Sequence, residues 1–306
     1  LFFTEKGKCF WLKVYEIPEG SKTSKGRAIQ NLINIPSDDK VMAYINTKDL
    51  KDEEYINKHY VIMATKKGQV KKTSLEQYSR PRTNGINAIT IKEDDELLEA
   101  KLTNGDSQVM LAVRSGKAIR FEEHQIKSTG RKTKGVRGIR MSYKEDSVIG
   151  MLVIKREGQI FVVSEKGFGK RTYASEYRTI NRGGQGVINM GVTKKTGEVV
   201  ATFPVTDDHQ VMLVTDQGKL IRTPVDGVRY TGRSAQGVTL FKVASDEKVV
   251  SVAWLINEED EEETTEAAAV DGEATSTNTN SEENTSEAGG DSSEEGQSTA
   301  SEDETS

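Results

Sequence analysis

The sequence contains little of what disulfide scaffolds, metal centres and membrane proteins require. Its 306 residues include one cysteine and three scattered histidines, which excludes an intramolecular disulfide framework and a multi-thiolate zinc site. No apolar run approaches the roughly 18 residues of a membrane span, and the N-terminus lacks the regions of a signal peptide. We therefore expect a cytoplasmic protein with no metal site, no catalytic residue and no membrane partner. Because no methionine begins the chain, we also expect it to be a piece of a longer protein.

Charge divides the chain into two parts. Residues 257–306 contain 18 acidic residues, no basic residue and no aromatic residue, and such a composition does not bury enough apolar surface to fold alone. All 43 basic residues and the other 30 of the 48 acidic residues precede Asn257, so the first part has a net charge of +13. We predict a folded domain over 1–256 and a disordered acidic tail over 257–306, and we hypothesise that the tail competes with an anionic ligand.

A pattern of about 51 residues recurs five times in the first part. It begins with two apolar stretches around a short turn with glycine, as in 109–120 and 211–222, which is typical of a β-hairpin. After a second glycine we expect two more strands, for example over 136–141 and 148–154. The paired glycines of the five copies are Gly7 and Gly26, Gly68 and Gly85, Gly116 and Gly135, Gly167 and Gly186, and Gly218 and Gly237.

Four strands in a repeat of this length are typical of a propeller blade, which buries its faces against its neighbours. Helical periodicity is absent from the first part except over 48–57, a polar insertion that lengthens the first gap between copies. We therefore predict an all-β, propeller-like fold of four-stranded blades.

Basic residues recur at two fixed positions of the repeat. The fourth residue after the first glycine is Lys72, Arg120, Arg171 or Arg222, and only Trp11 interrupts this series. The fourth residue before the second glycine is Lys22, Arg131, Arg182 or Arg233, and in the remaining copy Arg80 and Arg82 flank a proline. Further basic residues of the same loops are Lys25, Arg27, Lys132, Lys134, Arg137 and Arg229.

We interpret these residues as one basic rim that binds the phosphate backbone of duplex DNA. A cationic loop in constant register on each blade places the charges along one edge, and the small residues beside them allow a close approach. Few aromatic side chains are available for stacking on single strands, and no element resembles a helix that reads the major groove. We expect binding with little direct sequence readout, accompanied by DNA bending.

Three motifs suggest other chemistry, but their context favours structural roles. Residues 167–172 lack the spacing of a phosphate-binding P-loop and lead into a strand. Arg182-Gly183-Gly184 is similar to an RGG element but occupies the loop position of the repeat. Arg229 and Tyr230 are similar to the Arg-Tyr pair of type II topoisomerases, yet no acidic metal-binding cluster is visible, so we interpret Tyr230 as structural or DNA-contacting.

At these segments the sequence resembles the C-terminal domain of the A subunit of DNA gyrase. Residues 13–27, 133–140 and 169–172 are similar to characteristic stretches of that family, and the resemblance extends from Leu1 to about Ile256. It implies a β-pinwheel, a propeller-like disc of six blades that wraps DNA around its edge. It also implies a role in ATP-dependent negative supercoiling by the whole enzyme.

The resemblance implies double-stranded DNA, the rest of gyrase A and the whole of gyrase B, in a heterotetramer, as partners, and a location at the chromosome. The catalytic tyrosine domain is missing, so we expect no enzymatic activity and no cofactor in this chain, with ATP and Mg²⁺ used elsewhere in the parent enzyme. The family's box, Gln-Arg-Arg-Gly-Gly-Lys-Gly, is also missing, and 182–186 is a degenerate echo of it. We therefore expect blades two to six, which bend DNA but wrap it poorly.

Two other interpretations stay open. The equivalent domain in the A subunit of topoisomerase IV shares the repeat, although the number of blades and the tail favour gyrase. A propeller-like protein-interaction scaffold, such as the chromatin-bound exchange-factor repeats, has a similar period but does not explain one basic loop on each blade.

Overall fold

The computed structural model of the protein describes residues 1–21, 23–154 and 158–256. The regular structure of this part consists almost entirely of β-strands, which confirms the predicted all-β class. None of its helices is long and apolar enough to cross a membrane. The predicted tail, residues 257–306, lies outside the described residues.

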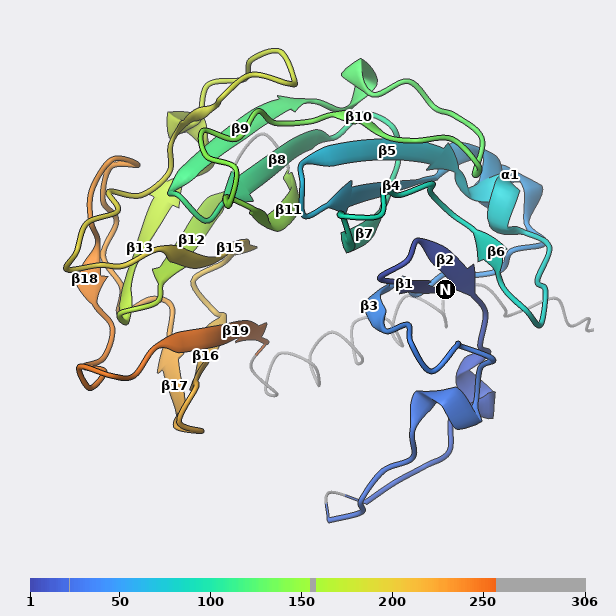
Figure 1. The fold of residues 1–306 in the computed structure, drawn as a ribbon, viewed down its shortest axis with the longest axis horizontal. Helices are drawn as coiled ribbons and strands as arrows, with labels where there is room; N and C mark the ends of the chain where they lie inside the picture. Colours follow the sequence, from blue (N-terminus) through green and yellow to red (C-terminus); the bar gives the residue numbers. More distant parts are fainter. Residues whose placement is uncertain (22, 155–157, 257–306) are drawn as a thin grey trace, which may run out of the picture. The chain divides into compact units, whose positions relative to one another are not determined.

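The strands form five antiparallel sheets in chain order, which we call blades 1 to 5 (Figure 1). From the inner to the outer side, blade 1 consists of β3 (Val41–Tyr44), β1 (Phe2–Thr4), β2 (Lys8–Phe10) and β6 (Ile86–Asn87). Blade 2 consists of β7 (Leu97–Thr103), β4 (Tyr60–Thr65), β5 (Gln69–Ser74) and β10 (Val136–Arg137). Blade 3 consists of β11 (Val148–Ile154), β8 (Gln108–Val113), β9 (Lys117–Glu122) and β14 (Val187–Ile188).

The last two blades follow the same order of strands. Blade 4 consists of β15 (Val199–Val205), β12 (Gln159–Ser164), β13 (Phe168–Tyr173) and β18 (Val238–Thr239). Blade 5 consists of β19 (Val249–Leu255), β16 (Gln210–Thr215) and β17 (Leu220–Pro224). Within the described residues no strand pairs with the outer edge of β17, so blade 5 has three strands where we predicted four.

The predicted hairpins are confirmed in every repeat. The first glycine of each copy takes a positive φ in the hairpin turn, for example +73° at Gly167, a conformation that costs little only without a Cβ atom. Residues 167–172 accordingly form this turn and the strand that follows it, as we expected.

The strand after each second glycine joins the preceding blade, which the sequence pattern does not reveal. β6 pairs with β2, β10 with β5, β14 with β9 and β18 with β13. These strands are only two residues long, so the strands predicted over 136–141 and 238–243 are too long. The second glycine allows this exchange: at Gly237 φ is +81°, and a Cβ atom would lie 2.5 Å from the carbonyl oxygen of Gly169.

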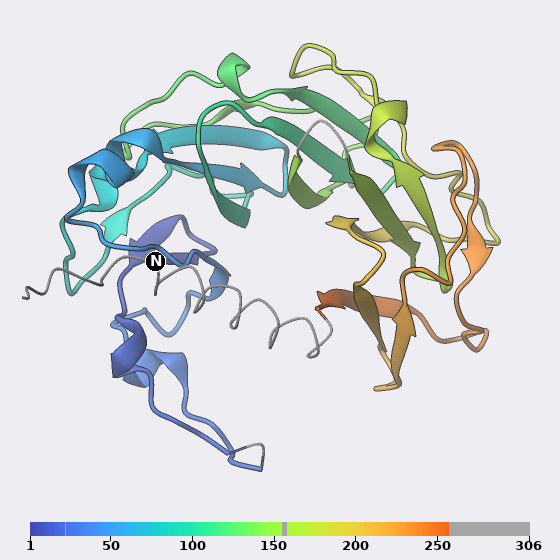
Figure 2. The ribbon, with the colours of Figure 1, turned by 180° about the vertical axis from the view of Figure 1, so that it is seen from behind.

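Apolar side chains between neighbouring blades form the core. One cluster combines Ile62 and Val70 of blade 2 with Leu111 and Phe121 of blade 3, all fully buried. The inner strands β3, β7, β11, β15 and β19 contact one another in this order, and the short exchanged strands lie on the outer side (Figures 1 and 2). Each blade is therefore stabilised mainly by its neighbours, as is usual in repeat proteins.

Short 3-10 turns continue the chain after the second hairpin strand of the first four blades. These are η1 (Val14–Glu16), η3 (Leu75–Tyr78), η4 (Glu123–Gln125) and η5 (Ala174–Glu176), and a further turn is η2 (Ile29–Asn31). The insertion predicted over 48–57 contains the helix α1 (Glu53–Lys58). Asp52 caps this helix by accepting a hydrogen bond from the Tyr55 N–H group (3.1 Å).

Candidate nucleic-acid interface

The basic residues of the repeat lie mainly in five loops, which we call the outer loops. They cover residues 20–28, 79–87, 127–137, 178–188 and 229–239. The last three are anchored at two points on the outer edge of the preceding blade, on either side of the loop. In the fifth, the Thr231 N–H group donates to the Arg171 carbonyl (2.9 Å), and Val238 pairs with Gly169.

Hydrogen bonds connect the outer loops of successive repeats. In each case the chain just after one loop donates to the next loop. The bonds run from Thr90 N–H to Thr133 O (3.1 Å), from Arg140 N–H to Gly184 O (2.8 Å) and from Gly191 N–H to Ala235 O (3.2 Å). The second to fifth outer loops thus form one continuous band along the outer side of the blades (Figure 1).

The outer loops are strongly and uniformly basic. Together they contain fourteen Lys and Arg residues and no Asp or Glu. Nine of the sixteen predicted DNA-binding residues are exposed: Lys25, Arg27, Arg80, Arg82, Lys132, Lys134, Arg137, Arg222 and Arg229. Lys127 and Arg178 belong to the same exposed set, although we did not single them out from the sequence. Lys22 lies outside the described residues.

Three more predicted residues, Arg131, Arg182 and Arg233, are half-buried because they also fasten the loops. The Arg182 guanidinium donates to the carbonyl oxygens of Gln125 (2.9 Å) and Arg137 (3.0 Å). Arg233 donates in the same way to Ile188 (3.0 Å). In the part of the chain that the structure describes, none of these three or of the nine exposed residues forms a salt bridge.

Lys72, Arg120 and Arg171 do not belong to this surface. Their exposed fractions are 6%, 6% and 5%, so our expectation that they lie on an exposed rim is wrong. Each projects from the second hairpin strand into the junction with the next blade. A buried cation is costly unless its N–H groups are bonded, and in all three residues these groups are bonded.

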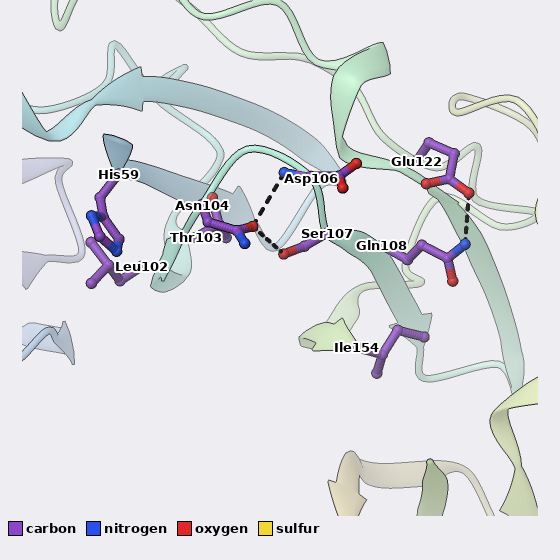
Figure 3. A pocket seen from close by; sticks show the side chains of 9 residues that line it. All are labelled: His59, Leu102, Thr103, Asn104, Asp106, Ser107, Gln108, Glu122 and Ile154. Atoms are coloured by element: carbon purple, nitrogen blue, oxygen red, sulfur yellow. Dashed lines mark hydrogen bonds between the residues drawn. The ribbon is translucent and has the colours of Figure 1, made fainter. Parts of the chain in front are cut away.

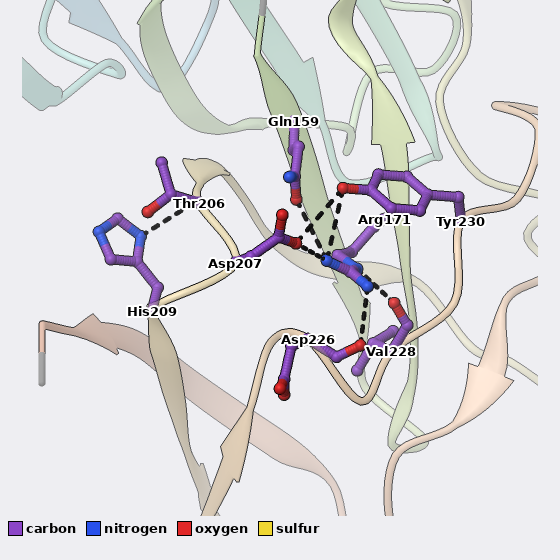
Figure 4. Close-up of polar contacts among 8 residues, drawn as sticks. All are labelled: Gln159, Arg171, Thr206, Asp207, His209, Asp226, Val228 and Tyr230. Atoms are coloured by element: carbon purple, nitrogen blue, oxygen red, sulfur yellow. Dashed lines mark hydrogen bonds and ion pairs between the residues drawn. The ribbon is translucent and has the colours of Figure 1, made fainter.

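Arg171 shows how such a junction is built (Figure 4). Its guanidinium donates to the carbonyl oxygens of Val228 and Asp226, the latter at 2.8 Å, and forms an ion pair with the Asp207 carboxylate. The guanidinium carbon lies 4.2 Å from the centre of the Tyr230 ring. Tyr230 therefore packs within the junction of blades 4 and 5, in agreement with our structural interpretation.

The other junctions use the same position of the repeat. Arg120 donates to the carbonyl oxygens of Ala174 and Tyr177, the latter at 3.2 Å, and burial lowers its pKa. The Lys72 ammonium lies 3.5 Å from the buried carboxylate of Glu123.

Trp11 continues this series and does not interrupt it. Its indole N–H donates to the Tyr78 carbonyl (2.9 Å) in the 3-10 turn of the next blade. Arg222 of blade 5 is exposed and donates to the side chain of Gln210. What the position requires is an N–H donor that reaches the next blade, and Trp, Lys and Arg all supply one.

A sequence signal for burial at this position was present but missed. Glutamine stands eight residues before the first glycine in three copies, at Gln108, Gln159 and Gln210. Each accepts a hydrogen bond from the arginine of its own hairpin. A neutral acceptor paired in register with an arginine indicates a fixed partner, which a freely solvated cation does not need.

The hollow between blades 2 and 3 is chemically different (Figure 3). Its lining residues include His59, Asn104, Asp106 and Glu122 and contain no Lys or Arg, so it does not suit a phosphate group. Within the described ranges, no group of three or more His, Cys, Asp or Glu residues has the arrangement of a metal site.

Blades that exchange an outer strand and carry a continuous band of unpaired basic loops define a propeller-like repeat domain with a cationic outer edge. A family model described as the DNA gyrase C-terminal domain, a beta-propeller, matches residues 1–46, 59–104, 108–155, 158–206 and 209–253. The chain belongs to this family.

The chain is similar over most of its length to the A subunit of DNA gyrase from several bacteria. It is 41% identical over 252 residues to the protein of Salmonella typhimurium, covering 82% of the chain and 28% of the relative. The corresponding values for Staphylococcus epidermidis are 42% over 262 residues, 85% and 29%. The chain thus spans less than a third of the length of these relatives.

Two solved structures share the fold. The DNA gyrase A C-terminal domain has a TM-score of 0.70 and 26% identity, covering 83% of this chain and 81% of that one. The C-terminal domain of DNA topoisomerase IV has a TM-score of 0.77 and 24% identity, with coverages of 90% and 83%. The second likeness concerns the fold alone.

Proposed function

We propose that this chain binds duplex DNA through its phosphate backbone and bends or wraps it around the outer loops, as the C-terminal domain of the A subunit of DNA gyrase. The continuous band of outer loops carries this proposal. A duplex presents one negative charge for about every 1.7 Å of its axis, and the band presents basic side chains that no protein carboxylate neutralises. Glycine, serine and threonine between the basic residues allow the backbone to approach closely.

Bending follows from the placement of the loops on successive blades. A duplex that contacts several outer loops must follow the edge that they form. Smooth bending of 20–30 base pairs by 40–90° costs on the order of 1–6 kcal/mol, so contacts from several loops are needed to offset it. Sequence preference then comes from the deformability of the DNA and not from contacts with base edges.

In this proposal the chain is a DNA-bending module and not itself an enzyme. The bent duplex is presented to the rest of gyrase A and to gyrase B in a heterotetramer, where ATP and Mg²⁺ support strand passage and negative supercoiling. The module then works in the cytoplasm, on the chromosome.

A salt titration of duplex binding tests the proposal. Neutralisation of phosphates makes log K fall linearly with log salt concentration, with a slope of about −0.9 for each phosphate contact. With at least one contact from each of four outer loops, we expect a slope of about −4 or steeper. A protein-interaction scaffold predicts no such line, and a slope near zero would contradict the proposal.

A second candidate is the C-terminal domain of the A subunit of topoisomerase IV, which the likeness of fold favours. The two functions differ in what happens to circular DNA that a nicking-closing enzyme relaxes in the presence of the protein. Wrapping of the gyrase type changes the linking number, whereas bending alone leaves it unchanged. Since the chain lacks the family's box, we expect a small change, and no change would favour the second candidate.

A further inference from the structure

Each of the second to fifth outer loops closes over one side chain of the preceding blade. The loop leaves the outer edge beside one residue of the hairpin strand and returns beside the residue two positions earlier, so the residue between these anchors lies beneath the loop. In the loop of residues 229–239 the anchors are Arg171 and Gly169, and the covered residue is Lys170. The covered residues of blades 1 to 4 are Phe10, Lys71, Ile119 and Lys170.

The two covered lysines donate hydrogen bonds to the backbone of the loops above them. Their exposed fractions are 1% for Lys71 and 0% for Lys170. The Lys71 ammonium donates to Arg131 O and Ala88 O (both 2.6 Å), and the Lys170 ammonium donates to Gly232 O (2.8 Å) and Arg233 O (2.6 Å). Each lysine thus ties down the carbonyl of the arginine that its loop presents.

Packing alone does not require a lysine at this position. Phe10 and Ile119 fill the same place in blades 1 and 3, without the cost of burying a charge. Burial lowers the pKa of Lys71 and of Lys170 to about 8, and the neighbouring Arg131 and Arg233 lower it too, while Glu176 acts in the opposite direction on Lys170. Among the described residues neither lysine forms a salt bridge, so its charge stays uncompensated beneath the loop.

We propose that Lys71 and Lys170 are positioning residues for DNA binding, which hold the outer loops 127–137 and 229–239 in the conformation that presents their basic side chains to phosphates. The carbonyl oxygens of Arg131 and Arg233 are drawn inward, which directs the rest of these residues outward. The charge of each lysine also adds to the positive potential at its loop. This inference rests on the proposed function and extends it to two residues that are themselves shielded from DNA.

The double variant K71I/K170I tests the inference, since isoleucine is the residue that blade 3 uses. We expect backbone amides of residues 129–135 and 231–237 to exchange hydrogen about tenfold faster. Duplex binding should weaken about tenfold at 0.1 M salt, and the salt slope should become shallower by about 2, one phosphate contact for each loop. Methionine variants, K71M and K170M, keep an unbranched chain of similar length and replace the double variant if it does not fold.

The matched control is K67I/K166I, which removes two lysines from the hairpin turns of the same blades. We expect this control to leave loop exchange and the salt slope unchanged. A folded K71I/K170I variant with the affinity and slope of the original chain would overturn the inference, as would an equal loss in the control. If the original chain did not bind duplex DNA, the proposed function would fail, and hydrogen exchange would still show whether the lysines hold the loops.

Discussion

The hairpin turns and the outer loops both carry basic residues, but only the turns face carboxylates. In the turns, ion pairs join Lys6 to Asp38, Lys67 to Asp94 and Arg114 to Glu198. In the described part of the outer loops, no basic side chain has such a partner. Exposed pairs contribute only about 0–1 kcal/mol to stability, so their main consequence is electrostatic. They neutralise one side of each blade and leave the attraction for phosphates at the other.

The neutral side is built into the backbone of the turns. Three carboxylates in the acidic turns each accept a hydrogen bond from a backbone N–H group of a hairpin turn. These bonds join Asp39 to Lys6 (3.1 Å), Asp95 to Lys67 (2.9 Å) and Asp146 to Ser115 (3.1 Å). Since the fold needs these carboxylates, neutralisation of the turns is a consequence of how the blades are made.

The sharpest contrast is expected between two arginines at one position of the repeat. Replacing Arg171 by methionine leaves the carbonyls of Val228 and Asp226 without their buried donor, and an unsatisfied buried group costs about 1–3 kcal/mol. We expect R171M to lower the free energy of unfolding by about 3 kcal/mol in urea titrations. The exposed counterpart R222M should change it by less than about 0.5 kcal/mol. Equal effects of the two variants would contradict the assignment of Arg171 to the blade junction.

Charge reversal should separate the two sides in DNA binding. Arg82, Lys134 and Arg229 are exposed residues of three different outer loops. The variant R82E/K134E/R229E should weaken duplex binding about a hundredfold at 0.1 M salt, with a salt slope shallower by about 2 to 3. The loss should be similar for unrelated DNA sequences, since phosphates and not bases are contacted.

The control for this reversal carries the same change of charge on the other side. In K6E/K67E/K219E, three lysines of the hairpin turns are reversed, and we expect little loss of binding. An equal loss in this variant would mean that the net charge of the domain, and not the band of outer loops, governs DNA binding.

The deletion of residues 257–306 tests whether the acidic tail competes for the outer loops. Tethered anionic residues act at a high effective concentration, so we expect the shortened chain to bind DNA about tenfold more tightly at low salt. The gain should disappear at high salt, where screening is strong. A full-length chain with Asn and Gln in place of the tail's Asp and Glu should behave like the deletion; unchanged affinity in both would reject competition.

The sequence predicted the blades better than their connections. Alternating apolar stretches and turn glycines report local geometry, so the hairpins and their period followed directly. The partner of β10 or β18 is a non-local property, and a two-residue strand carries no periodicity that identifies it. Arg171 illustrates the remaining error: a basic residue in constant register indicated a surface, whereas its glutamine partner in the same hairpin pointed to a buried network.

The smallest effect is expected at the one hairpin turn, among those described, whose paired carboxylate is buried. Glu247 accepts hydrogen bonds from the Lys219 ammonium (2.7 Å) and the Thr215 hydroxyl (2.6 Å). These bonds, that of Lys219 first, lower its pKa from 4.5 to about 2 despite burial. The unfolded chain therefore takes up a proton near pH 4.5 that the folded chain refuses until about pH 2, so this carboxylate's contribution to stability is lost as the pH falls through that window.

In E247Q this contribution is missing at every pH, so its stability should depend less on pH between 4.5 and about 2 than that of the original chain. Thermal unfolding across this range, compared with E198Q at an exposed ion pair of another turn, measures the difference as a few degrees of Tm. A parallel pH dependence in E247Q and the original chain would show that the buried carboxylate is not held ionised by Lys219. Neutralisation of the turns would then depend on the exposed pairs alone, which salt screens, and the contrast with the outer loops should fade as the ionic strength rises.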